Sequence, residues 1–194
     1  MFHELFRILA LCFLCVTSTL VQARETSSVT QYPVAGKTAA EIYADIKARA
    51  PRVANNATFA FTMIATKTDK REKASAKSCR YDRIKTSAIY NFVIPKHSNP
   101  DAMAGKTRAK WVSFVAYLKI HEEGHRTIWR RCLADYDQAA LALEAATCKA
   151  LDLTREKLLN GLKRKCLAED EAYDVQFRKE VLREPFVAQA LRGK

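Results

Sequence analysis

Two histidines spaced four residues apart, His121 and His125, carry the clearest chemical signal in this chain. Side chains at positions i and i+4 of a helix lie on one face, so both imidazoles can bind the same metal ion. Glu122 lies next to that face, where its carboxylate can take a proton from a metal-bound water. Zinc held by three protein groups lowers the pKa of its water toward about 7. The HExxH spacing therefore predicts a zinc (Zn2+) hydrolase with His121 and His125 as ligands and Glu122 as the catalytic base.

A long amphipathic helix must position these residues. From about residue 107, apolar side chains recur at helical spacing on one stripe, with charges on the other side. The pattern predicts one helix from about 107 to 147 and a second from 153 to about 182. The stripe of the first helix contains Trp111, Phe114, Val115, Leu118, His121, His125, Ile128, Cys132, Tyr136 and Ala139. A chance match by two exposed helix histidines is the alternative, but histidine is scarce, with four in the chain.

The segment before these helices predicts a small sheet. Thr38 is followed three residues later by Glu41, as in a capping box, so a short helix is expected over 39–50. Aromatic and β-branched residues then gather in three stretches that predict strands, at 58–66, 78–84 and 87–94, the last ended by Pro95. The expected fold class is α+β, in which the short helix and a small antiparallel sheet pack against a long, disulfide-stapled helical hairpin that carries HExxH.

The first 23 residues have the features of a signal peptide. Arg7 precedes an apolar run at 8–20, and Val21-Gln22-Ala23 fits a cleavage site. A transmembrane anchor is the alternative, but the run is shorter than the roughly 20 residues needed to span a bilayer. We therefore expect a signal peptide (1–23), a flexible leader (24–31) and a single zincin-like domain (32–194). The mature protein is expected to be secreted or periplasmic, with no transmembrane segment.

The net charge of +12 raises the question of an anionic partner. Eight basic residues lie within the segment 67–85. Such a patch can dock nucleic acid or an anionic envelope surface. The segment has no recognised nucleic-acid motif, so no nucleic-acid partner is expected. A solvated loop and strand face is the favoured interpretation, with an anionic envelope surface as the alternative.

Four cysteines follow the signal peptide: Cys79, Cys132, Cys148 and Cys166. In an exported protein this even set suggests two disulfides, with three possible connectivities. If the two long helices fold back about residue 149, facing residues have numbers that sum to about 298, which Cys132 and Cys166 satisfy. The expected disulfides are therefore Cys132–Cys166 and Cys79–Cys148. Pairing of Cys148 with Cys166, or reduced thiols, is the alternative.

The same hairpin geometry locates a third zinc ligand. It places residues 173–177 opposite 121–125, on a helix face that carries Asp170, Tyr173, Asp174 and Phe177. Asp174 is therefore the carboxylate best placed to complete the site, and Tyr173 could donate a hydrogen bond to a developing oxyanion. The alternatives are a solvated helix acid at 174 and a core aromatic at 173.

Two further candidates for the third ligand are less well placed. Glu144 follows His125 by nineteen residues, a gap that some zincins use. Along a helix, however, this offset is roughly 28 Å. His97 follows the last predicted strand and reaches the site only if the sheet packs against it.

The order of these motifs resembles a bacterial family of secreted zinc-dependent proteases, also known as domain of unknown function 922. The likeness covers most of the mature chain, and HExxH is its specific part. It includes Tyr32-Pro-Val-Ala-Gly-Lys-Thr-Ala-Ala-Glu41, Ser78-Cys79-Arg80, Phe92-Val-Ile-Pro95 and His121-Glu-Glu-Gly-His125. The resemblance implies a zinc-dependent protease, although the family's label itself follows from the HExxH pattern.

One departure from that family concerns the third ligand. The family tends to carry a histidine within four to six residues after a Tyr-Asp or Phe-Asp pair. Here Tyr173-Asp174 is present, but residues 175–180 contain no histidine. If that histidine is the family's third ligand, Asp174 must replace it, or the protein is a degenerate relative with weakened metal binding.

Two classes of function follow from these features. The leading expectation is a metallopeptidase that acts on a peptide or protein substrate. In it, Glu122 takes the proton of a zinc-bound water and returns it to the leaving amine. The alternative is a non-catalytic, cationic envelope-binding protein derived from such a protease. The missing histidine and the positive charge motivate this second class.

Overall fold

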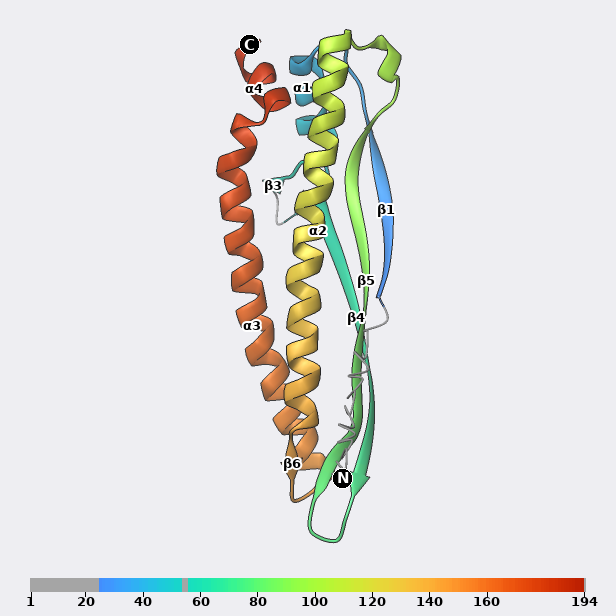
Figure 1. Ribbon diagram of the computed structural model, residues 1–194, viewed down its shortest axis with the longest axis vertical. Coiled ribbons are helices and arrows are strands. Elements are labelled where there is room, and N and C mark those ends of the chain that lie inside the picture. The colour runs from blue at the N-terminus through green and yellow to red at the C-terminus, as the bar shows by residue number, and fades with distance from the viewer. Residues whose placement is uncertain (1–24, 54–55, 194) are drawn as a thin grey trace, which may run out of the picture.

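The computed structural model describes residues 25–53 and 56–193 and is elongated (Figure 1). Two long helices run side by side along one face of a sheet whose strands follow the same axis (Figure 1). Two shorter helices lie at one end of the molecule, and a β-hairpin forms the other (Figure 1). The predicted signal peptide, residues 1–23, lies outside the described residues.

The main sheet has three long strands in the order β1–β5–β4. They are β1 (Glu25–Val34), β4 (Phe61–Ala74) and β5 (Cys79–His97), and the short β6 (Glu144–Ala145) pairs with the start of β5. β4 and β5 form an antiparallel hairpin, whereas β1 runs parallel to β5. The sheet is therefore mixed, and the prediction of an antiparallel sheet is wrong at β1. The connection between β1 and β5 contains a helix and β4, and it is therefore long enough for the crossover that a parallel pair requires.

Residues 25–31, for which a flexible leader is predicted, form the first part of β1. Its threonines and Val29 favour extended structure. The hydroxyls of Ser28 and Thr30 donate hydrogen bonds to Asn91 Oδ1 on β5, at 3.3 and 3.0 Å. An edge strand with a solvent-exposed face tolerates polar residues, so the polar sequence of this segment is compatible with a strand.

β5 is a single long strand rather than the two predicted strands at 78–84 and 87–94. Pro95 lies within it, paired with Tyr32 of β1. Proline lacks a backbone N–H, so a central strand normally excludes it. β4 pairing with β5 begins at Val93, so position 95 has a strand neighbour on the β1 side alone, and the missing donor costs no β4 hydrogen bond.

Four α-helices complete the described fold, and Thr38 and Glu41 form the predicted capping box at the first. The helices are α1 (Ala39–Arg49), α2 (Gly105–Leu141), α3 (Cys148–Glu180) and α4 (Pro185–Arg192). Short 3-10 turns span Pro100–Ala102 (η1) and Val181–Arg183 (η2), and Arg52–Val53 (β2) pairs with Asn56–Ala57 (β3). None of the helices in the described part of the chain is long and apolar enough to cross a membrane.

α2 and α3 form the predicted helical hairpin, and two disulfides fasten it. Cys132–Cys166 joins the two helices, and Cys79–Cys148 ties the start of α3 to β5, both as the sequence predicts. α2 ends at Leu141, earlier than predicted, and α3 begins at Cys148, where Thr147 caps it by accepting a hydrogen bond from the Ala150 N–H.

The largest apolar core lies at the helical end of the molecule, where α1, α4 and the first half of α2 meet the sheet. Phe114 stacks on Phe186 of α4 with ring centroids 5.1 Å apart, and both are fully buried. α3 contributes little to the core, since it buries just Leu151 and Cys166. Its position against α2 therefore depends on partly buried side chains such as Leu162 and Phe177 and on the Cys132–Cys166 disulfide.

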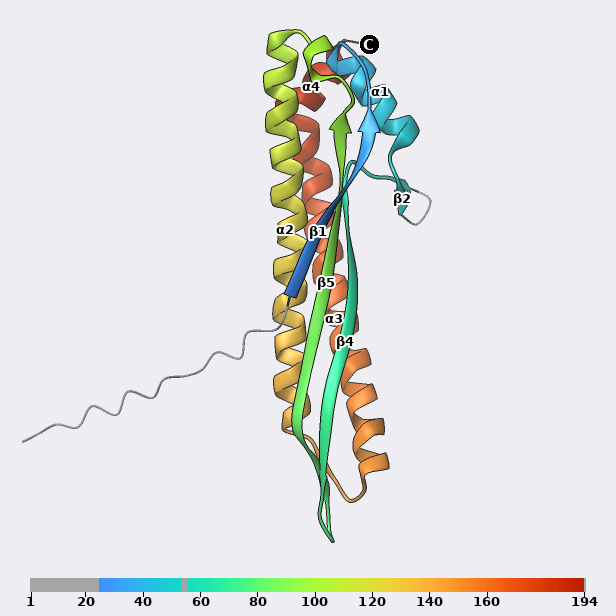
Figure 2. The same ribbon diagram turned by 90° about the vertical axis from the view of Figure 1, so that its right-hand side faces the viewer.

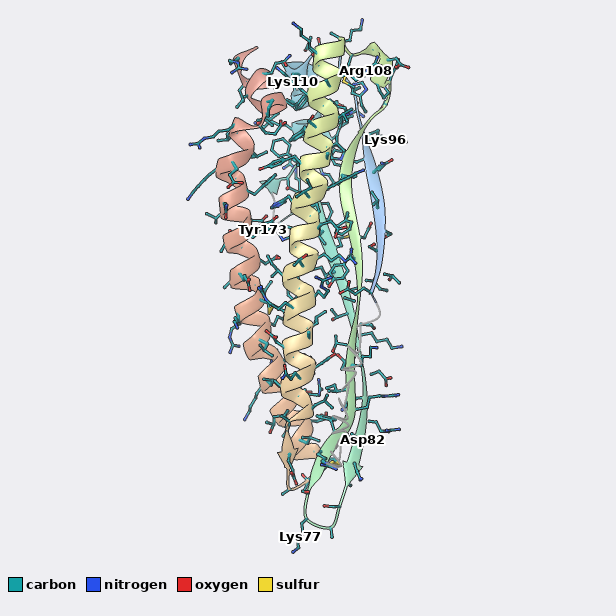
Figure 3. All side chains as sticks on the ribbon, in the orientation of Figure 1. Lys77, Asp82, Lys96, Arg108, Lys110 and Tyr173 are labelled. Atoms are coloured by element: carbon teal, nitrogen blue, oxygen red, sulfur yellow. A yellow bond between two sulfur atoms is a disulfide. The ribbon has the colours of Figure 1, made fainter. Side chains whose placement is uncertain are left out.

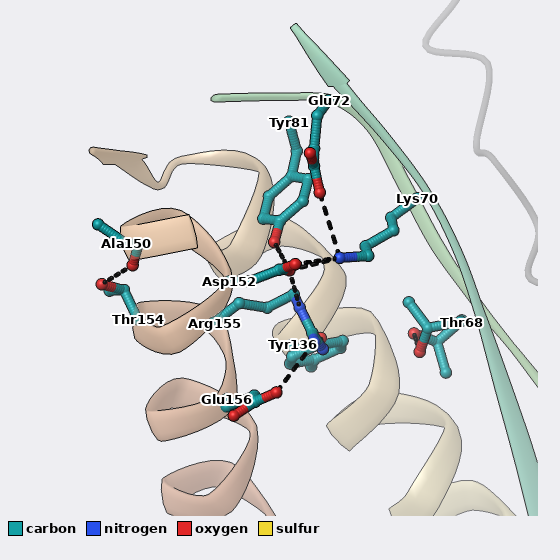
Figure 4. A network of polar contacts seen from close by, with 11 residues as sticks. Thr68, Lys70, Glu72, Tyr81, Tyr136, Ala150, Asp152, Thr154, Arg155 and Glu156 are labelled. Carbon is teal, nitrogen blue, oxygen red and sulfur yellow. Dashed lines mark hydrogen bonds and ion pairs between the residues drawn. The ribbon is translucent and has the colours of Figure 1, made fainter. Parts of the chain in front are cut away.

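A polar network fixes the hairpin end of the molecule (Figure 4). The Asp152 carboxylate of α3 accepts hydrogen bonds from Lys70 of β4, from Tyr81 of β5 and from Arg155 one turn along α3. Arg155 also donates to the Tyr136 hydroxyl of α2, at 3.0 Å. These contacts connect both strands to both long helices, so the hairpin is attached to the helical body.

Candidate metal centre

The antiparallel packing of α2 and α3 brings two histidines opposite two aspartates. His121 faces Asp174, and His125, one turn further along α2, faces Asp170, one turn earlier on α3. The numbers of the facing residues sum to 295 in both pairs, close to the 298 of the nearby disulfide Cys132–Cys166. The hairpin geometry therefore explains why these four side chains meet.

Three donor atoms converge on one point. His121 Nε2 and His125 Nε2 are 3.1 Å apart, and Asp174 Oδ1 lies 3.1 Å from the first and 3.2 Å from the second. Ligands on a tetrahedral zinc ion with bonds of about 2.0–2.1 Å are separated by about 3.3 Å. The triangle of His121, His125 and Asp174 therefore has a size that can hold a metal ion, and it is compatible with zinc.

Asp170 holds His125 in the orientation that a metal ligand needs. Its Oδ1 lies 2.8 Å from His125 Nδ1, so the ring donates at Nδ1 and turns Nε2 toward the other two donors. A carboxylate on the far nitrogen is a common support for metal-bound histidines. The His121 ring is held differently, by stacking between α3 aromatics: its centroid lies 3.8 Å from that of Phe177 and 4.7 Å from that of Tyr173.

The charges around the histidines favour a cation at this point. Burial alone would lower the pKa of His125, but the hydrogen bonds and charges of Asp170 and Asp174 outweigh it and raise the pKa to about 10. Burial would raise the pKa of Asp174, but the contacts with His121 and His125 hold it well below its usual range. Both histidine side chains are more than 90% buried, so these interactions are weakly screened by solvent.

Glu122 lies beside the triangle rather than in it. Its side chain is 1% exposed, and its Oε2 accepts a 2.6 Å hydrogen bond from the Thr62 hydroxyl of β4. Burial raises the pKa of Glu122, while Thr62 and the two histidines partly oppose this shift. A buried carboxylate with a raised pKa, next to a candidate metal site, is a candidate for proton transfer.

Tyr173 packs over the glycine of the HExxH motif. A Cβ placed on Gly124 would lie 2.2 Å from Tyr173 Oη, so the phenol occupies space that any other residue at 124 would fill. The side chain points from α3 toward α2 (Figure 3). Burial and the charge of Glu122 raise its pKa, so the phenol keeps its proton at neutral pH and can donate a hydrogen bond.

The triangle opens into a cleft of about 770 Å³ between α3 and β4. His121, His125 and Asp174 line it on the helix side, and residues 58–62 and Ile64 line it on the strand side. Phe177, Val181 and Leu182 make one part of the cleft apolar. The three candidate ligands are therefore accessible from this cleft.

The other predicted ligands lie elsewhere. His97 is buried against Trp111, where its ring accepts from the Asn99 N–H and contacts the Gly36 carbonyl, so it is a structural histidine. Glu144 is in β6, which follows the C-terminal end of α2. A second group of potential ligands, Glu72 with Cys79 and Cys148, is not available because both sulfurs form a disulfide.

Two contacts of the candidate site were not predicted from the sequence. The sequence pattern places Asp170 on the correct helix face but assigns it no role, although its spacing of four residues from Asp174 matches the spacing of the histidines. The Thr62–Glu122 hydrogen bond joins residues sixty positions apart through tertiary packing, and no local pattern signals it.

Comparison with known proteins adds a family. Residues 29–180 match the family described as "Bacterial protein of unknown function (DUF922)". The chain belongs to this family. The description of the DUF922 family gives no function, and no curated protein and no solved structure matches the chain significantly. The two disulfides of this DUF922 protein point to an oxidising, extracytoplasmic compartment.

Proposed function

We propose that this protein is an extracytoplasmic, zinc-dependent metallopeptidase. The single observation that carries the proposal is the triangle of His121 Nε2, His125 Nε2 and Asp174 Oδ1, with sides of 3.1–3.2 Å. Two histidines and a carboxylate with one open position are typical of catalytic rather than structural zinc. The cysteines, which structural sites favour, are used in disulfides.

The residues around the triangle suit hydrolysis of an amide. A zinc ion bound there supplies a Lewis acid that polarises a carbonyl and lowers the pKa of water. Glu122 takes the proton from the attacking water and passes it to the leaving amine, which departs neutral. Thr62 holds the Glu122 carboxylate. The Tyr173 hydroxyl, which packs over Gly124, is the proposed hydrogen-bond donor to the developing oxyanion.

Metal content tests the site. We expect about one zinc per chain by elemental mass spectrometry of the purified mature protein. The double variant His121→Ala/His125→Ala should lose the metal, and Asp174→Ala should bind it far more weakly. Glu171→Ala is a matched control, because Glu171 also lines the cleft from α3 but lies outside the triangle. Absence of zinc from wild-type protein prepared without chelator, or its retention in the double variant, would contradict the site.

Turnover tests the role of Glu122. Glu122→Gln should keep zinc and reduce cleavage of fluorescently quenched casein by about 10²-fold or more, because general acid–base catalysis contributes on the order of 10²–10⁴. Glu123→Gln changes the neighbouring, half-exposed carboxylate that pairs with Arg126, and should leave the rate nearly unchanged. Equal rates for Glu122→Gln and wild type would remove Glu122 from the mechanism.

A second candidate function rests on the hairpin end. Lys67, Lys73, Lys77 and Arg80 are exposed on β4, β5 and their turn, and make no ion pair with the described residues. A non-catalytic protein could bind an anionic envelope surface through them. Salt-sensitive binding to anionic vesicles, together with no hydrolysis by the zinc-loaded protein, would favour this function over a peptidase.

A further inference from the structure

The outer edge of β4 is unpaired where it borders the metal centre. β4 pairs with β5 on one side, and no strand in the described part of the chain pairs with its other side. In an antiparallel pair, every second residue turns its N–H and C=O away from the partner strand. Those groups of the segment from Phe61 to Thr66 therefore lie along the edge, and Phe61, Thr62 and Ile64 line the cleft that contains the candidate zinc ligands.

Charge along β4 distinguishes this part of the edge from the rest. Residues 67–73 contain six charged side chains, which protect an exposed edge from pairing with another chain. Residues 58–66, Thr-Phe-Ala-Phe-Thr-Met-Ile-Ala-Thr, contain none. Charge thus protects the edge of β4 over residues 67–73, away from the metal centre. Beside the metal centre, residues 58–66 leave the edge free to pair with another strand.

The wall opposite this edge can hold apolar side chains. Phe177, Val181 and Leu182 line the cleft from α3 and η2, and Leu182 is 53% exposed. A strand added to β4 would direct every second side chain toward the helices. Its intervening side chains would face the open side of the sheet, which no helix covers at this level (Figure 2).

We propose that the cleft binds its substrate as an extended peptide, added as a further strand to the edge of β4 at residues 61–66, with an apolar side chain against Phe177, Val181 and Leu182. Main-chain hydrogen bonds then supply affinity, and the apolar wall supplies selectivity. Thr62, which holds Glu122 by a 2.6 Å hydrogen bond, lies in this same segment, so the bound strand passes next to the catalytic base. The cleavage step rests on the proposed peptidase function, whereas the binding mode does not.

The binding mode can be tested without turnover. Short random peptides displayed on phage are selected on zinc-loaded Glu122→Gln protein, and the enriched sequences are synthesised. We expect apolar residues to be enriched, and the peptides to slow amide hydrogen exchange at every second residue from Phe61 to Thr66. N-methylation of the peptide backbone should weaken binding about five- to tenfold per lost hydrogen bond, at alternate positions only.

Matched variants test the apolar wall. Leu182→Asp should weaken peptide binding about tenfold or more, whereas Val175→Asp, at an exposed apolar residue outside the cleft, should not. Failure to enrich peptides, peptides that leave β4 exchange unchanged, or N-methyl effects without alternation would overturn the edge-strand proposal. Peptides that protect β4 but are not cleaved by the zinc-loaded wild-type protein would support the edge-strand proposal and contradict the peptidase function. Cleavage of peptides that leave the exchange of β4 unchanged would support the peptidase and overturn the edge-strand proposal.

Discussion

At the scale of single residues, Asp170 decides which nitrogen of His125 faces the other donors. It accepts the Nδ1–H at 2.8 Å, which leaves Nε2 available as a ligand. Asp170→Ala should therefore lower zinc affinity by about ten- to a hundredfold, the usual effect of removing such a support. Competition with a fluorescent zinc chelator measures this change. Asp170→Asn keeps an acceptor oxygen and should lose less, while equal affinity for Asp170→Ala and wild type would show that the contact is not needed.

Gly124 gives a prediction in which two residue-level effects oppose each other. Alanine in a helix interior is favoured over glycine by roughly 1 kcal/mol. A Cβ at this position, however, would lie 2.2 Å from Tyr173 Oη, which forces the phenol or α3 to move. Overpacking of this kind costs about 1–3 kcal/mol. Gly124→Ala should therefore lower the free energy of unfolding, measured by urea denaturation.

The double variant Gly124→Ala/Tyr173→Ala separates these two effects. With the phenol removed, the alanine at 124 no longer meets a contact, so Gly124→Ala in the Tyr173→Ala background should be neutral or stabilising. A destabilisation of the same size in both backgrounds would contradict the role of Tyr173 as the neighbour that requires glycine at this position.

At the scale of secondary-structure elements, the candidate site depends on how firmly α3 lies against α2. α3 supplies Asp170 and Asp174 but buries just Leu151 and Cys166 of its own residues. Cys166 lies one turn before Asp170, and its disulfide with Cys132 is the nearest covalent link to the site. The loops closed by the two disulfides predict similar stabilisation, about 4 kcal/mol each. Stability alone therefore does not distinguish them, whereas metal affinity should.

Removing the two disulfides one at a time tests this dependence. Cys132→Ala/Cys166→Ala should lower zinc affinity at least about tenfold while circular dichroism shows the helices retained, because α3 can separate from α2 at the site. Cys79→Ala/Cys148→Ala should lower the melting temperature comparably and leave zinc affinity almost unchanged, since this disulfide lies at the far end of α3. Equal zinc affinities in the two variants would show that helix packing alone positions the ligands.

The helical hairpin was also the part of the fold that the sequence predicted best. Helical periodicity is local, and a single assumption about the turn placed Cys132 opposite Cys166 and Asp174 near His121. The strands were harder to predict. The parallel pairing of β1 with β5 joins segments more than sixty residues apart, such as Glu25 and Ala88, and nothing in the polar sequence of β1 specifies its partner. The contact of Thr62 with Glu122 was not predicted either, because it depends on how the sheet packs against α2, and the local sequence does not specify that packing.

At the scale of the whole molecule, the two ends are stabilised by different interactions. The helical end has the large apolar core around Phe114 and Phe186, whereas the hairpin end combines smaller apolar clusters with a disulfide and the polar network of Asp152 (Figure 4). Apolar packing does not titrate, but a carboxylate network does. Acid should therefore loosen the hairpin end before the helical end.

Asp152 sets the pH range of that loosening. Hydrogen bonds from Lys70 and Tyr81, opposed by burial and reinforced by Arg155, lower the pKa of Asp152 to about 2, against an unfolded value near 3.9. A lowered carboxyl pKa stabilises the fold above the unfolded value, and this contribution is lost as pH falls from about 4 to about 2. Because the side chain is 36% exposed, solvent screening limits the contribution to about 1 kcal/mol.

Asp152→Asn should therefore lower the melting temperature by about 2–4 °C at pH 7. The difference from wild type should shrink between pH 4 and pH 2, since both proteins then carry an uncharged group at 152. Asp69→Asn removes an exposed partner of Arg83 on the same hairpin and should change the melting temperature much less. Amide exchange should rise first at Lys70 and Tyr81 in acid, while amides around Phe114 stay protected. Simultaneous loss of protection at both ends would instead mean that the molecule unfolds as one cooperative unit and that Asp152 stabilises the whole of it.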